Sequence, residues 1–176
     1  MEYFWLKQDK RYVDVPHIHR FAGTYRRSDF TVEHAYKIAD RNVVFVNSEH
    51  RLDYTDVIDR QIFLVSEDVK SVFKMYDPSI TFKTFCLLDN VHMDLKLYYA
   101  PIIPLIDGTD EPERFSREGR RDREPVIRRA YLKSRPIVRL RELPPDGVVI
   151  RLDVAESLLR RGLFRADMAR LVLTCV

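Results

Sequence analysis

The stretch from residue 117 to residue 129 is rich in guanidinium groups. Arginine's planar fork of N–H donors grips phosphate or carboxylate groups. The stretch fits a solvated loop, a contact with a protein partner, or a site for nucleic acid or another anion. Acidic residues dilute the basic charge and no aromatic side chain is interleaved to stack on bases, so of the two kinds of macromolecular partner a protein is favoured over nucleic acid. The arginines are Arg117, Arg120, Arg121, Arg123, Arg128 and Arg129, interspersed with Glu118, Asp122 and Glu124.

Two of the five histidines have a spacing that suits metal binding. In His17-Ile18-His19 an apolar residue separates the histidines, so a β-strand would place both imidazoles on one face. A metal would need a third ligand, which His34, His50 or a nearby aspartate would have to supply after folding. No compact cysteine or histidine motif accompanies the pair, and solvated surface histidines are the simpler interpretation. We therefore expect no metal and no other cofactor.

The sequence lacks the motifs of common catalytic sites. Its five glycines never cluster into a phosphate-binding loop, and no Gly-x-Ser-x-Gly turn is present. Cys86 and Cys175 lie in apolar stretches, where a thiol behaves as a small core residue. We expect a protein that is not an enzyme. The first alternative is a small enzyme or ligand-binding protein that uses His17, His19 and the arginine-rich stretch, and the second is a regulatory nucleic-acid binder.

The clearest structural signal is a pattern of strand, capping residue and amphipathic helix that occurs twice. The first copy has a strand at 62–65, a cap at Ser66 and apolar residues at helical spacing up to Tyr76, before Asp77-Pro78 ends the helix. The second copy has a strand at 148–151 and a cap at Asp153.

Other segments give weaker predictions. Residues 80–88 and 95–100 are expected to pair as a hairpin, and residues 169–176 to close the second unit as a strand. Val43 to Val46 is predicted as a buried strand, and Ala130 to Leu132 as a short extended segment. The polar stretch 107–123 is expected to be a surface loop.

These elements predict an α+β fold. Its sheet is mixed and largely antiparallel, with two principal amphipathic helices in two similar strand–helix–strand units. We expect a single compact domain over residues 1–176, with an N-terminal segment at 1–60, a first unit at 61–106 and a second at 125–176. Divergent duplication and independent origin of the two units explain the pattern equally well.

Composition limits the classes of partner. The 30 basic and 27 acidic residues give a formal charge of +3, too small to indicate nucleic acid. No apolar run approaches the roughly 20 residues that cross a bilayer. Residues 1–7 lack the order of a secretory signal peptide, so we expect a cytoplasmic protein with no membrane partner.

Several short motifs occur at a distinctive spacing in the second two thirds of the chain. They are Phe63-Leu64-Val65-Ser66-Glu67, Tyr98-Tyr99 with Pro101, Ile106-Asp107, and Asp153-Val154-Ala155-Glu156-Ser157-Leu158-Leu159. Their arrangement resembles a family of bacterial immunity proteins of polymorphic toxin systems, the eleventh immunity family. The similarity covers residues 61–171, and the arginine-rich region 117–129 departs from the family. The resemblance implies an intracellular α+β protein that binds and neutralises a cognate protein toxin and has no catalytic residues.

Overall fold

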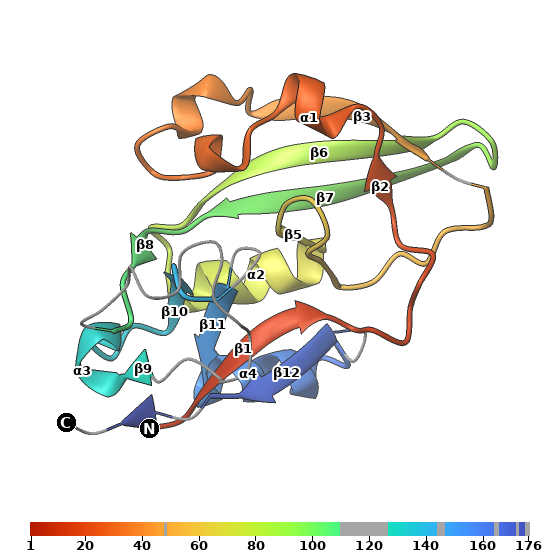
Figure 1. The fold of residues 1–176 in the computed structure, drawn as a ribbon. Helices are drawn as coiled ribbons and strands as arrows, with labels where there is room; N and C mark the ends of the chain where they lie inside the picture. Colours follow the sequence, from red (N-terminus) through yellow and green to blue (C-terminus); the bar gives the residue numbers. More distant parts are fainter. Residues whose placement is uncertain (48, 110–126, 144–146, 164–165, 172, 175–176) are drawn as a thin grey trace, which may run out of the picture.

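The computed structural model describes residues 1–47, 49–109, 127–143, 147–163, 166–171 and 173–174 (Figure 1). The elements are β1 (Tyr3–Gln8), β2 (His17–Ile18), α1 (Phe21–Thr24), η1 (Arg27–Asp29), η2 (Ala35–Lys37), β3 (Arg41–Asn47), β4 (Val57–Ile58), β5 (Leu64–Val65), α2 (Glu67–Tyr76), β6 (Thr81–Asp89), β7 (Asp94–Ile102), β8 (Leu105–Ile106), β9 (Ile127–Arg128), α3 (Arg129–Leu132), β10 (Ile137–Leu140), β11 (Gly147–Arg151), α4 (Leu152–Arg160), β12 (Ala166–Arg170) and β13 (Leu173–Thr174).

The first sheet has six strands in the order β2-β3-β6-β7-β5-β4. Its centre is the long hairpin of β6 and β7, which stays in register from Thr81 opposite Ile102 to Asp89 opposite Asp94. The predicted hairpin is therefore confirmed. Strand β3 runs parallel to β6, and the other pairs in this sheet are antiparallel.

The second sheet has five strands in the order β12-β1-β11-β10-β8. Strand β1 lies between β11 and β12 and is antiparallel to both. The N-terminal segment thus contributes a strand to the interior of this sheet, while β2 and β3 belong to the first sheet. A separate two-stranded ladder joins β9 and β13.

Both strand–helix–strand units have the same topology. In each, two parallel strands joined by a helix flank a third, antiparallel strand: β5-α2-β6 flank β7, and β11-α4-β12 flank β1. The middle strand comes from the following segment in the first unit and from the N-terminal segment in the second. The α+β fold and its largely antiparallel pairing are confirmed.

The two helices begin differently. Ser66 caps α2 as predicted, because its side chain accepts a hydrogen bond from the Val69 N–H. The prediction that Asp153 caps α4 is wrong. The capping position is Arg151, which makes no side-chain capping bond, and Asp153 lies within the first turn. Its carboxylate instead accepts two hydrogen bonds from the Arg151 guanidinium, at 2.7 and 2.6 Å.

Two further predictions need correction. Val43 to Val46 is a strand but is not buried throughout: Val44 and Val46 face the interior, while Val43 and Phe45 are exposed. The segment from Ala130 to Leu132 is helical, within the single turn α3, rather than extended. An isolated triplet of apolar residues does not distinguish one helical turn from a short strand.

Three hydrophobic clusters hold the elements together. The first joins both helices to both sheets, with Phe73 of α2 and Leu158 of α4 among its members. The second fills the face of the first sheet that is covered by residues 18–38. The third lies on the other face of the second sheet, around Tyr3 and Ile127. No helix within the described residues is long and apolar enough to span a membrane.

Candidate protein-binding surface

The first sheet has one apolar face that the described residues cover only in part. Because β3, β6 and β7 lie side by side, residues in register form rows across the sheet. On the face that bears α2, two successive rows lie beyond the helix. We call these six residues the open sheet face: Val43, Cys86 and Leu97 in one row, and Phe45, Leu88 and Leu95 in the next.

The side chains of this face are unusually exposed for apolar residues in the middle of a sheet. Val43 is 67% exposed, Phe45 52%, Leu95 53% and Leu97 50%. Cys86 and Leu88, on the central strand, are half-buried. The alternate residues of the same strands point to the opposite face, where Phe85 and Leu87 are fully buried. The exposure therefore belongs to one face and not to the strands as a whole.

Helix α2 is too short to cover the hairpin. Its ten residues span about 15 Å, whereas the nine-residue strands β6 and β7 each span about 30 Å. Lys70 lies over the ring of Tyr99 and Lys74 over that of Phe82, which places α2 above the half of the hairpin remote from its tip. Figure 1 shows the other half extending to the right beyond the helix.

A small polar group marks the border between α2 and the open sheet face. The Lys70 ammonium lies 3.0 Å from the Glu67 carboxylate and 3.7 Å from the centre of the Tyr99 ring. Burial, together with the hydrogen bond that the Tyr99 hydroxyl makes to Glu67, raises the pKa of Tyr99 to about 12. The same hydrogen bond and the Lys70 charge lower the pKa of Glu67. The charges and hydrogen-bonding groups of Glu67, Lys70 and Tyr99 are therefore paired with one another.

The histidine pair lies along the edge of this face. His17 is opposite Asn47 in the β2–β3 ladder, and the main-chain N–H of His19 donates to the Phe45 carbonyl at 2.8 Å. Both histidines are exposed and Ile18 between them is buried, so the two imidazoles share the side of the sheet that carries Phe45. Among the described residues, no three His, Cys, Asp or Glu side chains are grouped closely enough to hold a metal ion.

The arginine-rich stretch is only partly described. Arg117, Arg120, Arg121 and Arg123 lie outside the described residues, as does most of the predicted 107–123 loop. Arg128 ends β9 and Arg129 begins α3, beside the third hydrophobic cluster on the second sheet. The structure does not bring these two arginines to the open sheet face.

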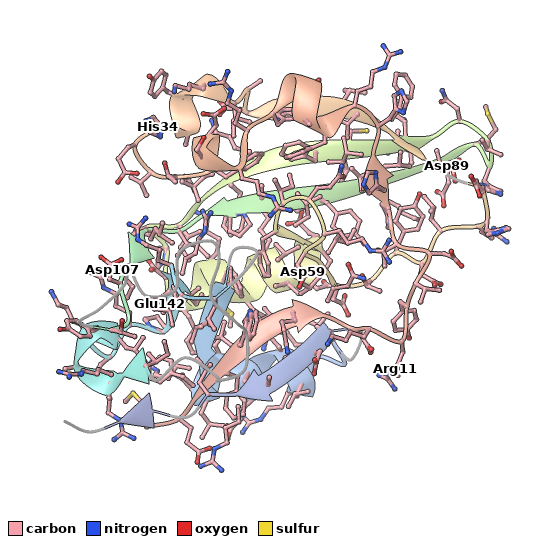
Figure 2. The ribbon with its side chains drawn as sticks, in the orientation of Figure 1. Arg11, His34, Asp59, Asp89, Asp107 and Glu142 are labelled. Carbon is pink, nitrogen blue, oxygen red and sulfur yellow. The ribbon has the colours of Figure 1, made fainter. Side chains whose placement is uncertain are left out.

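Two acidic sites at opposite sides of the molecule have structural explanations (Figure 2). At the hairpin tip, the Asp89 carboxylate accepts hydrogen bonds from the N–H groups of Val91 and His92 and lies 2.8 Å from His92 Nδ1. On the other side, buried Glu142 accepts bonds from the N–H groups of Gly108 and Thr109. Both carboxylates order a loop.

A shallow apolar hollow of about 260 Å³ lies between α4 and strands β1 and β12. Phe4, Ala155, Leu159 and Met168 are among its lining residues, and Glu156 is its charged one. It is smaller than the pockets of about 300–1,000 Å³ that usually hold small molecules.

The thiol of Cys86 is free and half-buried on the open sheet face, and Cys175 lies outside the described residues. Sequence reasoning placed Cys86 and Val43 to Val46 in the core and so missed this face. A signal was present, since β3 is apolar on both faces while only one helix was predicted nearby.

No protein-family model matches the chain, and no curated protein sequence does.

Proposed function

We propose that this protein is a non-catalytic binding protein that neutralises a cognate protein toxin in the cytoplasm by covering its active site. The single observation that carries the proposal is the open sheet face. Large contiguous apolar patches on soluble proteins mark interaction sites, and this patch is presented by a regular, hydrogen-bonded sheet that needs no rearrangement to bind.

The energetics favour a protein partner over a small ligand. The open sheet face consists of two rows of side chains across three strands and is not a pocket. A partner must therefore be broad enough to span three strands. Full burial of a Phe or Leu side chain contributes about 1.5–3 kcal/mol, and aromatic residues at the centre of a patch commonly dominate binding. Phe45 is the aromatic residue of this face and is therefore the expected anchor.

The toxin as the class of partner rests on the resemblance of residues 61–171 to immunity proteins. Such a protein needs tight, stoichiometric binding and no chemistry of its own. Inhibition by occlusion requires only that the bound protein cover the toxin's catalytic groups. A regular sheet surface can do this without changing its conformation.

The direct test begins with the neighbouring reading frame, which we expect to encode a protein with a C-terminal toxin domain, and uses that domain. We expect one equivalent of this protein to abolish the toxin's activity, and the double variant Phe45→Ser/Leu97→Ser to raise the inhibitor concentration required by a factor of about 100 or more. The control is Val32→Ser, which removes an apolar side chain that is 53% exposed elsewhere on the surface. A one-to-one complex that retains full toxin activity would show that occlusion is wrong.

A further inference from the structure

The charges that border the open sheet face specify the chemistry of its partner. We infer, on the basis of the proposed function, that the partner presents an apolar cluster with a carboxylate beside it, and that this carboxylate meets Arg41. The partner is thus a protein surface that carries an acidic group next to its apolar contact. A partner surface that is basic or purely apolar at this place would not fit.

Arg41 lies in the row next to the open sheet face. It is in register with Thr84 on β6, and Thr84 is opposite Tyr99 on β7. The next row of the same face is Val43, Cys86 and Leu97. Arg41 is exposed, and no ion pair or side-chain hydrogen bond joins its guanidinium to any residue that the structure describes.

The acidic residues nearby do not compensate this charge. Glu67 is engaged by Lys70 and by the Tyr99 hydroxyl. Asp68 lies two positions from Lys70 on α2, and residues at that spacing point to different sides of a helix. The opposite border carries the two imidazoles of His17 and His19, which add no negative charge. Asp40, which precedes Arg41 in the chain, is ion-paired with Lys83 at 2.7 Å. None of these acidic side chains therefore neutralises Arg41.

This charge constrains what can cover the face. A partner seated on Val43 and Leu97 removes water from the adjacent guanidinium, and a charge that loses water without gaining a counter-ion opposes binding. A carboxylate is the most suitable counter-ion for the guanidinium, because it accepts two parallel N–H hydrogen bonds from arginine. Opposite charge at the border of an apolar contact also accelerates encounter and selects among partners.

The test measures binding of a catalytically inactive toxin domain from the neighbouring reading frame to Arg41→Gln and Arg41→Glu. We expect affinity to fall about tenfold or more for Arg41→Glu, with slower association, and less for Arg41→Gln. The matched control is Arg26→Glu, which makes the same charge change at an exposed position just before η1, in the segment that covers the opposite face of the first sheet. A partner Asp→Arg or Glu→Arg variant that restores binding to Arg41→Glu would identify the carboxylate.

The outcomes separate this inference from the proposed function. If the wild-type complex forms, Phe45→Ser/Leu97→Ser weakens it and Arg41→Glu binds like the wild type, the carboxylate inference is overturned and the proposed function stands. If Arg41→Glu and Arg26→Glu weaken binding equally, the effect is one of net charge and the inference is again overturned. If no complex forms with the wild-type protein, both the carboxylate inference and the proposed function are wrong.

Discussion

The side-chain amide of Gln61 holds both main-chain polar groups of Ile18. Its Oε1 accepts a hydrogen bond from the Ile18 N–H at 2.6 Å, and its Nε2 donates to the Ile18 carbonyl at 3.0 Å. Ile18 belongs to β2, at one edge of the first sheet, and Gln61 lies between β4 and β5, the strands at the other edge. The sheet therefore curls until its two edges meet through one side chain.

Replacing this amide should loosen the curled sheet. In Gln61→Leu the two polar groups of Ile18 lose their partners, and the free energy of unfolding should fall by about 1–3 kcal/mol. Urea denaturation measures the loss, and hydrogen exchange at the Ile18 amide localises it. In Gln61→Glu the acceptor for the Ile18 N–H remains, so that amide should stay protected. Unchanged exchange at Ile18 in Gln61→Leu would contradict this account.

The same substitution on the two faces of the first sheet should change the stability by very different amounts. Phe85 is fully buried, so Phe85→Ala should lower the free energy of unfolding by about 3–5 kcal/mol. Phe45 is 52% exposed on the open sheet face, and Phe45→Ala should change it by no more than about 0.5 kcal/mol. Thermal and urea unfolding of the pair provide the measurement. A large loss in Phe45→Ala would mean that the face is covered by the chain's own residues.

The pairing of Arg151 with Asp153 should make stability depend on pH in the acid range. The hydrogen bonds from Arg151 lower the pKa of Asp153 below its usual 3.8. A carboxyl group whose pKa is lower in the folded state stabilises the protein above the unfolded value, and the contribution disappears as pH falls through the folded value. Asp153→Asn should therefore destabilise the protein at pH 7 by about 0.2–1 kcal/mol, because the pair is partly exposed.

The same variant should match the wild type once the carboxylate is protonated, well below pH 4. Urea denaturation at a series of pH values from 7 downward tests the sign of the effect, because the difference between the two proteins should begin to shrink once the pH falls below the usual value of 3.8. Glu156→Gln, at an exposed position of α4, controls for loss of a negative charge on this helix. A difference between Asp153→Asn and the wild type that does not shrink as the pH falls below 3.8 would show that the effect is not electrostatic.

The hairpin tip depends on Asp89. Its side chain is 1% exposed, and its carboxylate accepts bonds from two main-chain N–H groups of the loop that follows. Asp89→Ala leaves these donors without their partner and should cost about 1–3 kcal/mol. Asp89→Asn keeps an acceptor oxygen, so its loss in the free energy of unfolding should be less than half of the loss in Asp89→Ala. If the two variants unfold at the same urea concentration, the main-chain bonds are not what orders the tip.

Local sequence signals predicted the elements they control directly. Ser66 specifies the start of α2 because its hydroxyl reaches the helix N–H groups, and Gly162 adopts the positive φ of 74° expected after the end of α4. Asp153 has the right residue type for a cap, yet Arg151 provides a charged partner two residues away and the helix begins earlier.

Features that depend on distant parts of the chain could not be read locally. An apolar strand such as 43–46 looks the same whether both its faces are covered or only one, so the open sheet face follows only from the length and position of α2. The sequence thus predicts that these segments are apolar strands, but it does not predict that one of their faces is exposed. Likewise, nothing within Tyr3 to Gln8 indicates that it lies between β11 and β12.

The position of β1 also has a consequence for biosynthesis. The ribosome makes residues 3–8 well before segments 147–151 and 166–170, in which these residues find both of their strand partners. The second sheet therefore cannot close until residue 170 has been added, whereas the β6–β7 hairpin can form as soon as it emerges. Contacts between such distant segments slow folding. We expect the nascent chain to expose the apolar residues of β1 until both partner strands have emerged, which makes that segment a natural site for chaperones to bind.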